Sequence, residues 1–248
     1  MLQRTTILIA LFLSLFMAEA SANNPTIIVV GDHSPPFRIF EDGRASGIYF
    51  DTIKEISKRM GFTPKFVQVP FKRALDMMRK GTADMMPGPN YTKERACNMV
   101  YTAAMLPAEP KAFYYRNPQN RILRFDDLQG KSVASTLGKD YNHILEKSPR
   151  TTLELVRNYE LAIQKVLFNR NDLVILPEFQ GDYLLHTRDL KLFKSPFKLP
   201  GKPSHICLSR NSHLQGRQEE LRKAMESIIA DGTFQKILDR YSPNLTTP

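Results

Sequence analysis

The sequence predicts an α/β fold with mainly parallel sheets, because short β-branched runs alternate with amphipathic segments of helical period along most of the chain. Thr26–Val30 is such a run, and Gly31 stops it as a turn stops a buried strand. The segment that follows carries Ile53, Ile56 and Met60 on one side, as a helix packed on a sheet does. The same alternation recurs further along, which favours two series of βα units.

The first series contains three expected strands and two expected helices. The strands are 26–30, 64–69 and 83–86, the helices are 51–60 and 71–80, and a turn lies at 41–43. Gly61 and Gly81 each follow the last periodic residue of a helix, where glycine commonly ends helices. Pro87-Gly88-Pro89 is expected to break the third strand, and Thr92 to cap a helix that contains Arg95.

The second series predicts strands at 131–136, 153–156, 172–176 and 205–209, and helices from about 140 and at 160–168, 215–230 and 234–241. Two stretches, 103–110 and 196–203, are the best candidates for boundaries between lobes. With two such crossings, the C-terminal helices can return to pack on the first lobe.

Residues 1–22 are expected to be a cleavable signal peptide. Arg4 supplies the positive charge, residues 7–17 form an apolar run, and Ala18, Ala20 and Ala22 fit the small-residue cleavage pattern. A retained membrane anchor is the alternative, but the apolar run is shorter than the ~20 residues that span a bilayer. We therefore expect a soluble protein exported from the cytoplasm; the resemblance described below implies the periplasm.

The formal net charge of +10 is spread along the chain. No run of four basic residues and no interleaving of basic with aromatic residues occurs, so nucleic acid is not an expected partner. The five histidines are isolated, and no CxxC spacing is present, so neither a metal nor another cofactor is expected. The two cysteines, Cys97 and Cys207, could form one disulfide in an oxidising compartment or remain free thiols.

Several short motifs occur in the order and spacing seen in one family of bacterial proteins. They are Pro35-Pro36-Phe37, Gly47–Asp51, Gly81–Asp84, Thr92–Arg95, Asp127–Val133, Asn171–Val174 and Asp231–Phe234. On these motifs, which span nearly all of residues 26–241, the chain resembles the bacterial extracellular solute-binding proteins of family 3. These are the periplasmic receptors of polar amino-acid uptake systems.

The resemblance implies a two-lobed periplasmic binding protein fold of type II, with mixed sheets flanked by helices and a ligand cleft between the lobes. Residues 23–104 and 206–248 would form lobe 1, and residues 105–205 would form lobe 2. The resemblance also implies hinge closure when the ligand binds.

The resemblance places three ligand contacts in lobe 1. Arg95 stands where family members hold the ligand carboxylate, and a guanidinium fork pairs well with a planar anion. Gly88 and Asn90 precede it, where relatives offer backbone amides and a short polar side chain. A surface arginine and an ordinary Pro-Gly-Pro-Asn turn are the alternatives.

Three further candidates are less closely tied to the family pattern. Phe37 follows the first strand and either packs on an apolar part of the ligand or covers the core. Arg73, in Phe-Lys-Arg-Ala-Leu, either points into the cleft or is solvated. Lys139 lies in a Gly-Lys-Asp segment that could offer charge and N–H groups to an anion from lobe 2, or could be structural only.

One departure from the family pattern bears on the ligand. Pro177 stands where amino-acid receptors place the aspartate that pairs with the ligand ammonium, and Glu178 follows it as a possible substitute. Without that carboxylate an α-ammonium would be unpaired in a closed cleft, which is costly. A carboxylate ligand without an α-amine is therefore an alternative to an amino acid, as is a peptide-like or aromatic compound.

The function predicted from these features is capture of a small polar or carboxylate-bearing solute by a monomeric, non-enzymatic protein for an inner-membrane ABC permease. A ligand-binding component of a membrane sensor is the first alternative. A dehydratase-like enzyme is the second, with Glu178 as its candidate acid or base.

Overall fold

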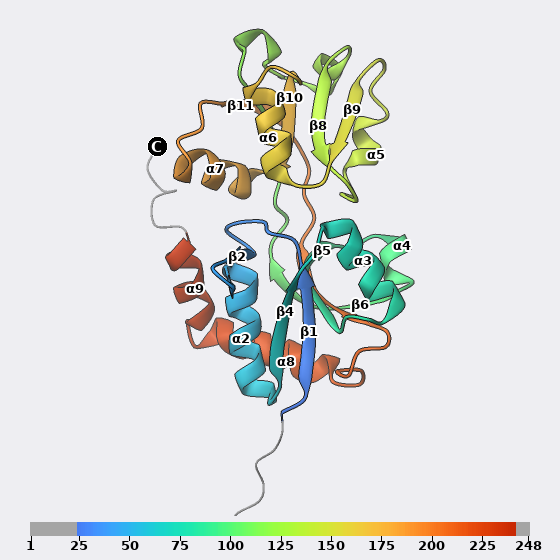
Figure 1. Ribbon diagram of the computed structural model, residues 1–248, viewed down its shortest axis with the longest axis vertical. Coiled ribbons are helices and arrows are strands. Elements are labelled where there is room, and N and C mark those ends of the chain that lie inside the picture. The colour runs from blue at the N-terminus through green and yellow to red at the C-terminus, as the bar shows by residue number, and fades with distance from the viewer. Residues whose placement is uncertain (1–23, 242–248) are drawn as a thin grey trace, which may run out of the picture.

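The computed structural model describes residues 24–241, which form two α/β lobes stacked along the long axis of the molecule (Figure 1). The expected signal peptide, residues 1–22, lies outside the described residues. Each lobe contains a five-stranded sheet with helices against it. Among residues 24–241, no helix has the length and apolar character that a membrane crossing requires.

The first sheet is built from both ends of the described chain. Its spatial order is β4 (Thr63–Gln68), β1 (Thr26–Gly31), β5 (Met85–Asn90), β12 (Ser204–Ser209) and β6 (Met99–Leu106). The hairpin of β2 (Ile39–Glu41) and β3 (Arg44–Ser46) and five helices complete this lobe: α2 (Ile48–Met60), α3 (Phe71–Lys80), α4 (Lys93–Ala96), α8 (Gln218–Ala230) and α9 (Thr233–Tyr241).

Side-chain alternation along β1 explains how helices cover both faces of this sheet. Successive residues of a strand point to opposite faces. Ile27 and Val29 belong to the core cluster formed with α2, α8 and α9, whereas Val30 belongs to the cluster formed with α3. The expected ends of α2 and α3 are confirmed, because Gly61 and Gly81 both adopt the left-handed conformation.

The second sheet has the order β11 (Phe193–Leu199), β7 (Lys111–Tyr115), β10 (Leu173–Pro177), β8 (Ser132–Thr136) and β9 (Thr152–Val156). Its helices are α5 (Asn142–Leu145), α6 (Tyr159–Leu167) and α7 (Glu178–Thr187). The helix expected from about residue 140 is therefore only one turn long. The strand β10 is buried along its whole length, as the continuous apolar run of a central strand requires.

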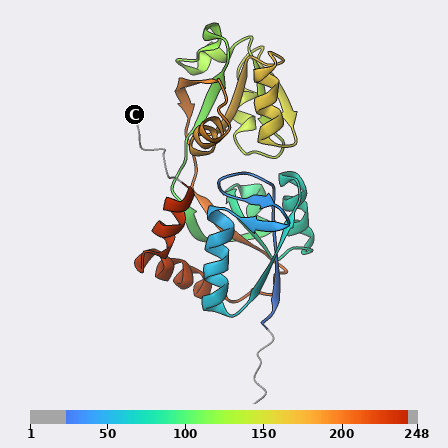
Figure 2. The same cartoon turned by 60° about the vertical axis from the view of Figure 1, so that its left-hand side comes forward.

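The sheets are mixed, as the family resemblance implies, and the expectation of mainly parallel sheets is wrong. β1 runs parallel to β4 and β5, and β8 runs parallel to β9 and β10. In contrast, β12 is antiparallel to β5 and β6, and β7 is antiparallel to β10 and β11. The antiparallel pairs all involve the strands that enter or leave a lobe, because the chain crosses between the lobes twice (Figure 2).

The strand β5 continues through Pro87-Gly88-Pro89, which was expected to break it. Ile206 of β12 pairs with Pro87 and Ser204 pairs with Asn90, so β5 has one residue more than its partner over this stretch. A bulge of this kind absorbs an extra residue and bends the strand. Gly88, with φ of 104°, takes the bulged conformation.

The two cysteines are free thiols, so the possible disulfide is not present. Cys207 is fully buried in β12, where it packs with Met86 and Met99. Cys97 is exposed at the end of α4, and its thiol donates to the carbonyl of Lys93. A buried strand position and an exposed helix end place the two sulfurs in different layers of the lobe.

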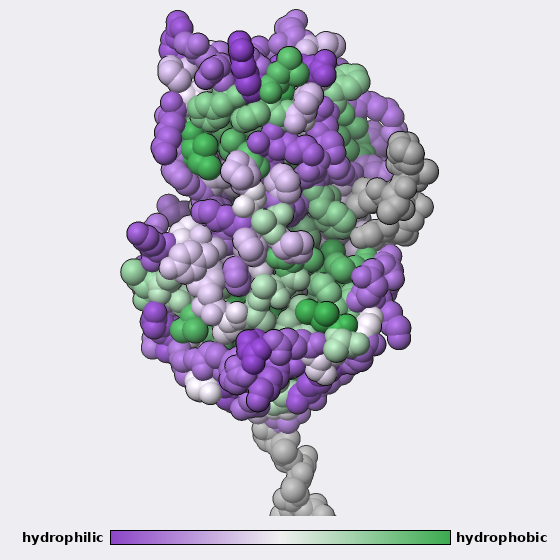
Figure 3. All heavy atoms as spheres, turned by 180° about the vertical axis from the view of Figure 1, so that it is seen from behind, coloured by the Kyte–Doolittle hydropathy of each residue, from purple (hydrophilic) through white to green (hydrophobic). Residues whose placement is uncertain are grey.

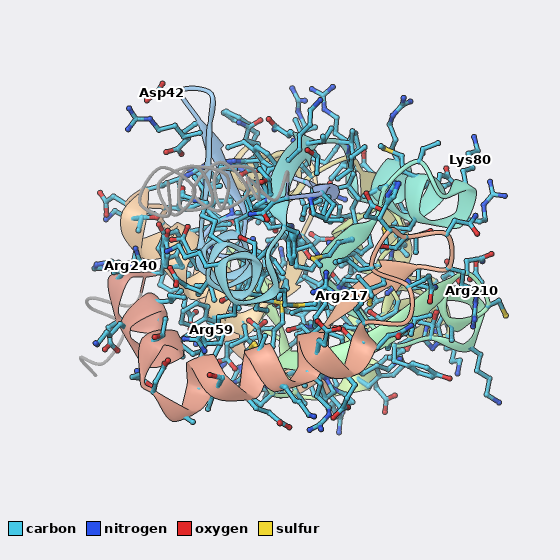
Figure 4. The ribbon with its side chains drawn as sticks, turned by 90° about the horizontal axis from the view of Figure 1, so that it is seen from below. Asp42, Arg59, Lys80, Arg210, Arg217 and Arg240 are labelled. Atoms are coloured by element: carbon cyan, nitrogen blue, oxygen red, sulfur yellow. The ribbon has the colours of Figure 1, made fainter. Side chains whose placement is uncertain are left out.

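The basic side chains of the first lobe are dispersed. Seen from below, Arg59, Lys80, Arg210, Arg217 and Arg240 lie apart on different elements (Figure 4). Several have acidic neighbours, such as Asp231 beside Arg59 and Glu220 beside Arg217. Charges arranged in this way give a solvated surface rather than a continuous basic stripe.

Asp84 joins three segments of the first lobe and supports a prediction about acid stability. Its carboxylate accepts the backbone N–H of Ile28 at 2.9 Å and that of His213 at 2.9 Å. Burial raises the pKa of Asp84, but these N–H groups and the His213 ring outweigh burial and hold it below its usual value. The contribution to stability is therefore complete above pH ~4 and is lost as the pH falls through the lowered pKa.

We expect Asp84→Ala to lower the free energy of unfolding at pH 7 by about 1–3 kcal/mol, because a buried N–H loses its acceptor. The loss relative to wild type should shrink when the pH is lowered below 4. Urea denaturation at both pH values measures this. Asp76→Ala, which removes an exposed ion pair with Arg79, is the control and should change little. A loss that does not depend on pH would contradict the account.

Candidate functional site

A cavity lies between the two lobes, beside the segments that cross between them. Its volume is about 60 Å³. The residues that line it come from both lobes and from the crossings: Ser34, Phe37, Arg38, Tyr49, Phe71, Gly88, Asn90, Arg95, Leu106, Pro107, Glu109, Lys111, Lys139, Asp140, Tyr141, Tyr159, Pro177, Gln180, Lys202 and Ser204. From behind, the molecule narrows at the level where the lobes meet (Figure 3).

Arg95 reaches this cavity from α4. Thr92 caps that helix as expected, because its hydroxyl accepts the N–H of Arg95 at 3.1 Å. The guanidinium of Arg95 donates to the carbonyl of Asn90 at 2.9 Å and, across the gap between the lobes, to the carbonyl of Gly138 at 2.7 Å. Both partners are neutral, so the charge of Arg95 is oriented by these bonds without being neutralised.

Gly88 and Asn90 form the wall next to Arg95. The Asn90 amide donates to Asp140 at 3.0 Å, which is a second bond between the lobes. A side chain at Gly88 would lie 2.5 Å from the Tyr49 ring and 2.6 Å from the Arg38 guanidinium. Glycine is therefore required here both by its positive φ and by the close approach of these two side chains.

Phe37 lies in the aromatic part of the wall. Its ring stacks on Tyr49 with centroids 4.9 Å apart and contacts Phe179 of α7 at 5.7 Å. Only 4% of Phe37 is exposed, so it belongs to the core of lobe 1 as well as to the cavity. The two expected roles of this residue are thus compatible.

Lys139 enters the cavity from lobe 2. Its ammonium lies 3.8 Å from the centroid of the Phe71 ring and 4.7 Å from that of Tyr159, so it contacts aromatic faces of both lobes. Burial lowers the pKa of Lys139 to about 7, and the cationic groups nearby add to this shift, whereas Asp32 opposes it.

Arg38 and Asp32 form a buried ion pair that the sequence analysis missed. Each is 4% exposed, and the Arg38 guanidinium lies 2.6 Å from the Asp32 carboxylate. Burial raises the pKa of Asp32, but Arg38 outweighs it and keeps the carboxyl ionised. Asp32 follows β1 at the carboxyl edge of the sheet, where α/β proteins bind ligands, and that position could have identified it.

The crossing segments, the start of β7 and the helix α7 contribute further polar groups that were not predicted. Lys202 pairs with Asp140 at 3.0 Å. Gln180, 1% exposed, donates to the hydroxyl of Ser34 at 2.7 Å and so joins the lobes on the other side of the cavity. Glu109 lies near Lys111; burial raises the pKa of the first and lowers that of the second.

Two predicted site residues do not line the cavity. Arg73 is exposed on the outer face of α3. Glu178 begins α7 and pairs with Lys194 at 2.9 Å and Lys198 at 2.6 Å, on an outer groove. The preceding Pro177 faces the cavity instead, so Glu178 does not take the place of the family's ammonium-binding aspartate.

Residues 26–244 match the sequence pattern of the bacterial extracellular solute-binding proteins, family 3. The chain belongs to this family. This solute-binding protein is 23% identical over 209 residues to PatH of Vibrio harveyi, which bears the name of an amino-acid ABC transporter-binding protein; the match covers 82% of each chain.

Solved structures share the fold of this solute-binding protein. An ancestral arginine-binding protein bound to glutamine superposes with a TM-score of 0.79 at 22% identity, covering 89% of this chain and 99% of that one. A histidine kinase sensor domain superposes with a TM-score of 0.76 at 18% identity, covering 88% and 96%. Identities this low show the fold, and the ligand must be argued from the cavity.

Proposed function

We propose that the protein is a periplasmic receptor that captures a small carboxylate-bearing solute between its lobes and delivers it to an ABC permease. The observation that carries the proposal is Arg95, whose guanidinium lines the cavity between the lobes and is hydrogen-bonded, within residues 24–241, to neutral carbonyls. A carboxylate can pair with such a group at little cost of reorganisation, because the protein already orients it.

The same bonds that surround the cavity would couple binding to closure. Arg95, Asn90 and Gln180 each make a hydrogen bond from one lobe to the other. We propose lobes of residues 23–104 with 206–248 and of residues 105–205, which rotate about the two crossings. A ligand that contacts both lobes would stabilise the closed form by the amount by which the ligand binds the closed form more tightly than the open form. We further propose that the receptor is monomeric and catalyses no reaction.

A membrane sensor component is the second candidate, and the structural likeness to a histidine kinase sensor domain favours it. Both candidates use the same cavity and differ in the partner that recognises the closed form. Reconstituting the receptor with its candidate permease and measuring solute-stimulated ATP hydrolysis separates them, because only the transport function predicts stimulation.

A thermal-shift screen of the unfolded and refolded protein tests the proposed function. The panel contains amino acids, small carboxylic acids, polyamines and short peptides. A ligand at 100 times its dissociation constant adds roughly 2.7 kcal/mol of stability, which corresponds to a shift of several degrees. A shift with a carboxylate that disappears in Arg95→Ala is expected. A panel in which only polyamines stabilise the protein would contradict the proposal.

A further inference from the structure

The cavity between the lobes has an excess of positive charge. Five cationic side chains line it, against two carboxylates, and the cations are Arg38, Arg95, Lys111, Lys139 and Lys202. The carboxylates are Glu109 and Asp140, and a third, Asp32, pairs with Arg38. Even with Asp32 included, two positive charges have no counterpart in the wall.

Ion pairs and neighbouring charges distinguish the five cations. Asp32 pairs with Arg38 and Asp140 pairs with Lys202. In the described residues Lys111 has no carboxylate within 4.0 Å, but Glu109 acts on it more strongly than any other acid does. Among residues 24–241, neither Arg95 nor Lys139 has a carboxylate within the 4.0 Å of an ion pair. Both contact the same Phe71 ring, Arg95 with its guanidinium carbon 5.6 Å from the centroid, so they lie on one stretch of the wall.

A ligand ammonium would find few free carboxylate groups in this cavity. Asp140 is already bonded to Lys202 and Asn90, and Glu109 accepts the N–H of Phe179 and lies near Lys111. Arg38 holds Oδ1 of Asp32, whose Oδ2 has no hydrogen-bond partner but belongs to a residue outside the cavity lining. An ammonium near Lys139 would instead meet a like charge, which is unfavourable in a site shielded from water.

We propose that the solute is a small dicarboxylate without an amino group, with one carboxylate on Arg95 and the other on Lys139; this rests on the proposed function. Two negative charges match the two uncompensated cations. The accessible space of about 60 Å³ corresponds to about two water molecules at the ~30 Å³ that each occupies in the liquid, which favours a compact ion. The Phe71 ring, which both cations contact, offers an apolar surface to the carbon chain.

The proposal also predicts a proton to be taken up on binding. With its pKa lowered to about 7, Lys139 is mostly neutral at pH 8, although Asp32 favours its charged form against Arg38, Arg95 and Lys111. A carboxylate beside it raises that pKa, so the amine gains a proton when the ligand binds. Below pH 6 Lys139 is already charged, and the uptake should vanish.

Matched pairs of ligands test the inference by calorimetry. Succinate and L-aspartate share one carbon skeleton, and glutarate and L-glutamate share another; the members of each pair differ by the amine alone. We expect at least one dicarboxylate to bind about 10-fold or more tightly than its amino-acid counterpart, because the dicarboxylate has no ammonium group to repel Lys139. An amino acid that binds as tightly as its partner, or more tightly, overturns the inference.

Variants of Lys139 test the second anchor. Lys139→Met should lower the affinity for the dicarboxylate by about 10-fold or more and the affinity for butyrate by less than about 3-fold. It should also abolish proton uptake, which is measured at pH 8 in buffers of different ionisation enthalpy. Lys139→Arg, which keeps the charge, should restore most of the affinity and confirms a folded site if Lys139→Met is unstable. Equal losses for the dicarboxylate and butyrate would overturn the role of Lys139.

The outcomes distinguish this inference from the proposed function. Binding of an amino acid that depends on Arg95 but not on Lys139 would overturn the inference of a dicarboxylate ligand and would leave the proposed receptor function intact. Binding of sulfate or phosphate in preference to every dicarboxylate also overturns it, since one compact anion then meets both cations. If no compound binds, both proposals fail together.

Discussion

Replacing Arg95 by alanine is expected to weaken binding of the solute by about 2–4 kcal/mol, or about 30- to 900-fold. The guanidinium is the cavity's only cation in the described residues that is both without a carboxylate partner and able to form a planar fork with one. Its removal also breaks the bond to Gly138 that helps to join the lobes. The effect should therefore appear chiefly as faster dissociation.

Titration calorimetry and stopped-flow dissociation measure this effect on the ligand found in the thermal-shift screen. Arg73→Ala is the matched control, because it removes an equal charge from the same lobe at an exposed position outside the cavity. It should leave the affinity within about 3-fold, as distant exposed charges are largely screened. Equal effects of the two substitutions would show that general electrostatic attraction, and not the fork of Arg95, holds the solute.

The largest effect on stability is expected from Phe50→Ala, at about 3–5 kcal/mol. Phe50 is 0% exposed in the core of lobe 1. Its ring centroid lies 5.0 Å from that of Phe40 and 4.6 Å from that of Phe66, so a truncation leaves a cavity between α2, the β2–β3 hairpin and β4.

Urea denaturation followed by circular dichroism gives the change in the free energy of unfolding. Phe168→Ala is the control, because that side chain is 68% exposed and should cost little. A loss below about 1 kcal/mol for Phe50→Ala would contradict the packing described for this lobe.

The sequence predicts those elements whose local signals agree with the fold. Gly61 and Gly81 end helices where expected, and Thr92 caps α4. The strands β6, β7 and β11 were not predicted, because they derive their pairing from crossings between lobes that no local pattern marks. The helix α7 was also missed, because Gly181 and the polar residues on either side of it, Gln180 and Asp182, weaken its helical signal. Glycine is required at position 181 because a Cβ atom there would overlap with the Tyr114 hydroxyl.

Five of the site residues predicted in the sequence analysis line the cavity, and the lining residues that it missed are those that the fold brings together from distant segments. Gly88, Asn90 and Arg95 came from the resemblance, whereas Phe37 and Lys139 are less closely tied to it. The ion pair of Arg38 with Asp32 was missed because the backbone bonds between Ser34 and Arg38, which fix Arg38 beside Asp32, are revealed by no composition or period. Glu178 was misplaced because one residue of register decides whether a side chain at a strand end faces the cavity or the outer groove.

The most direct test of the account is a crystal structure of the refolded protein with the solute that stabilises it most. We expect the solute between the lobes, with a carboxylate accepting both terminal N–H groups of Arg95 and the other end of the molecule beside Lys139. A solute bound anywhere outside the cavity, or bound within it by an ammonium facing Asp32 or Asp140, would contradict the account.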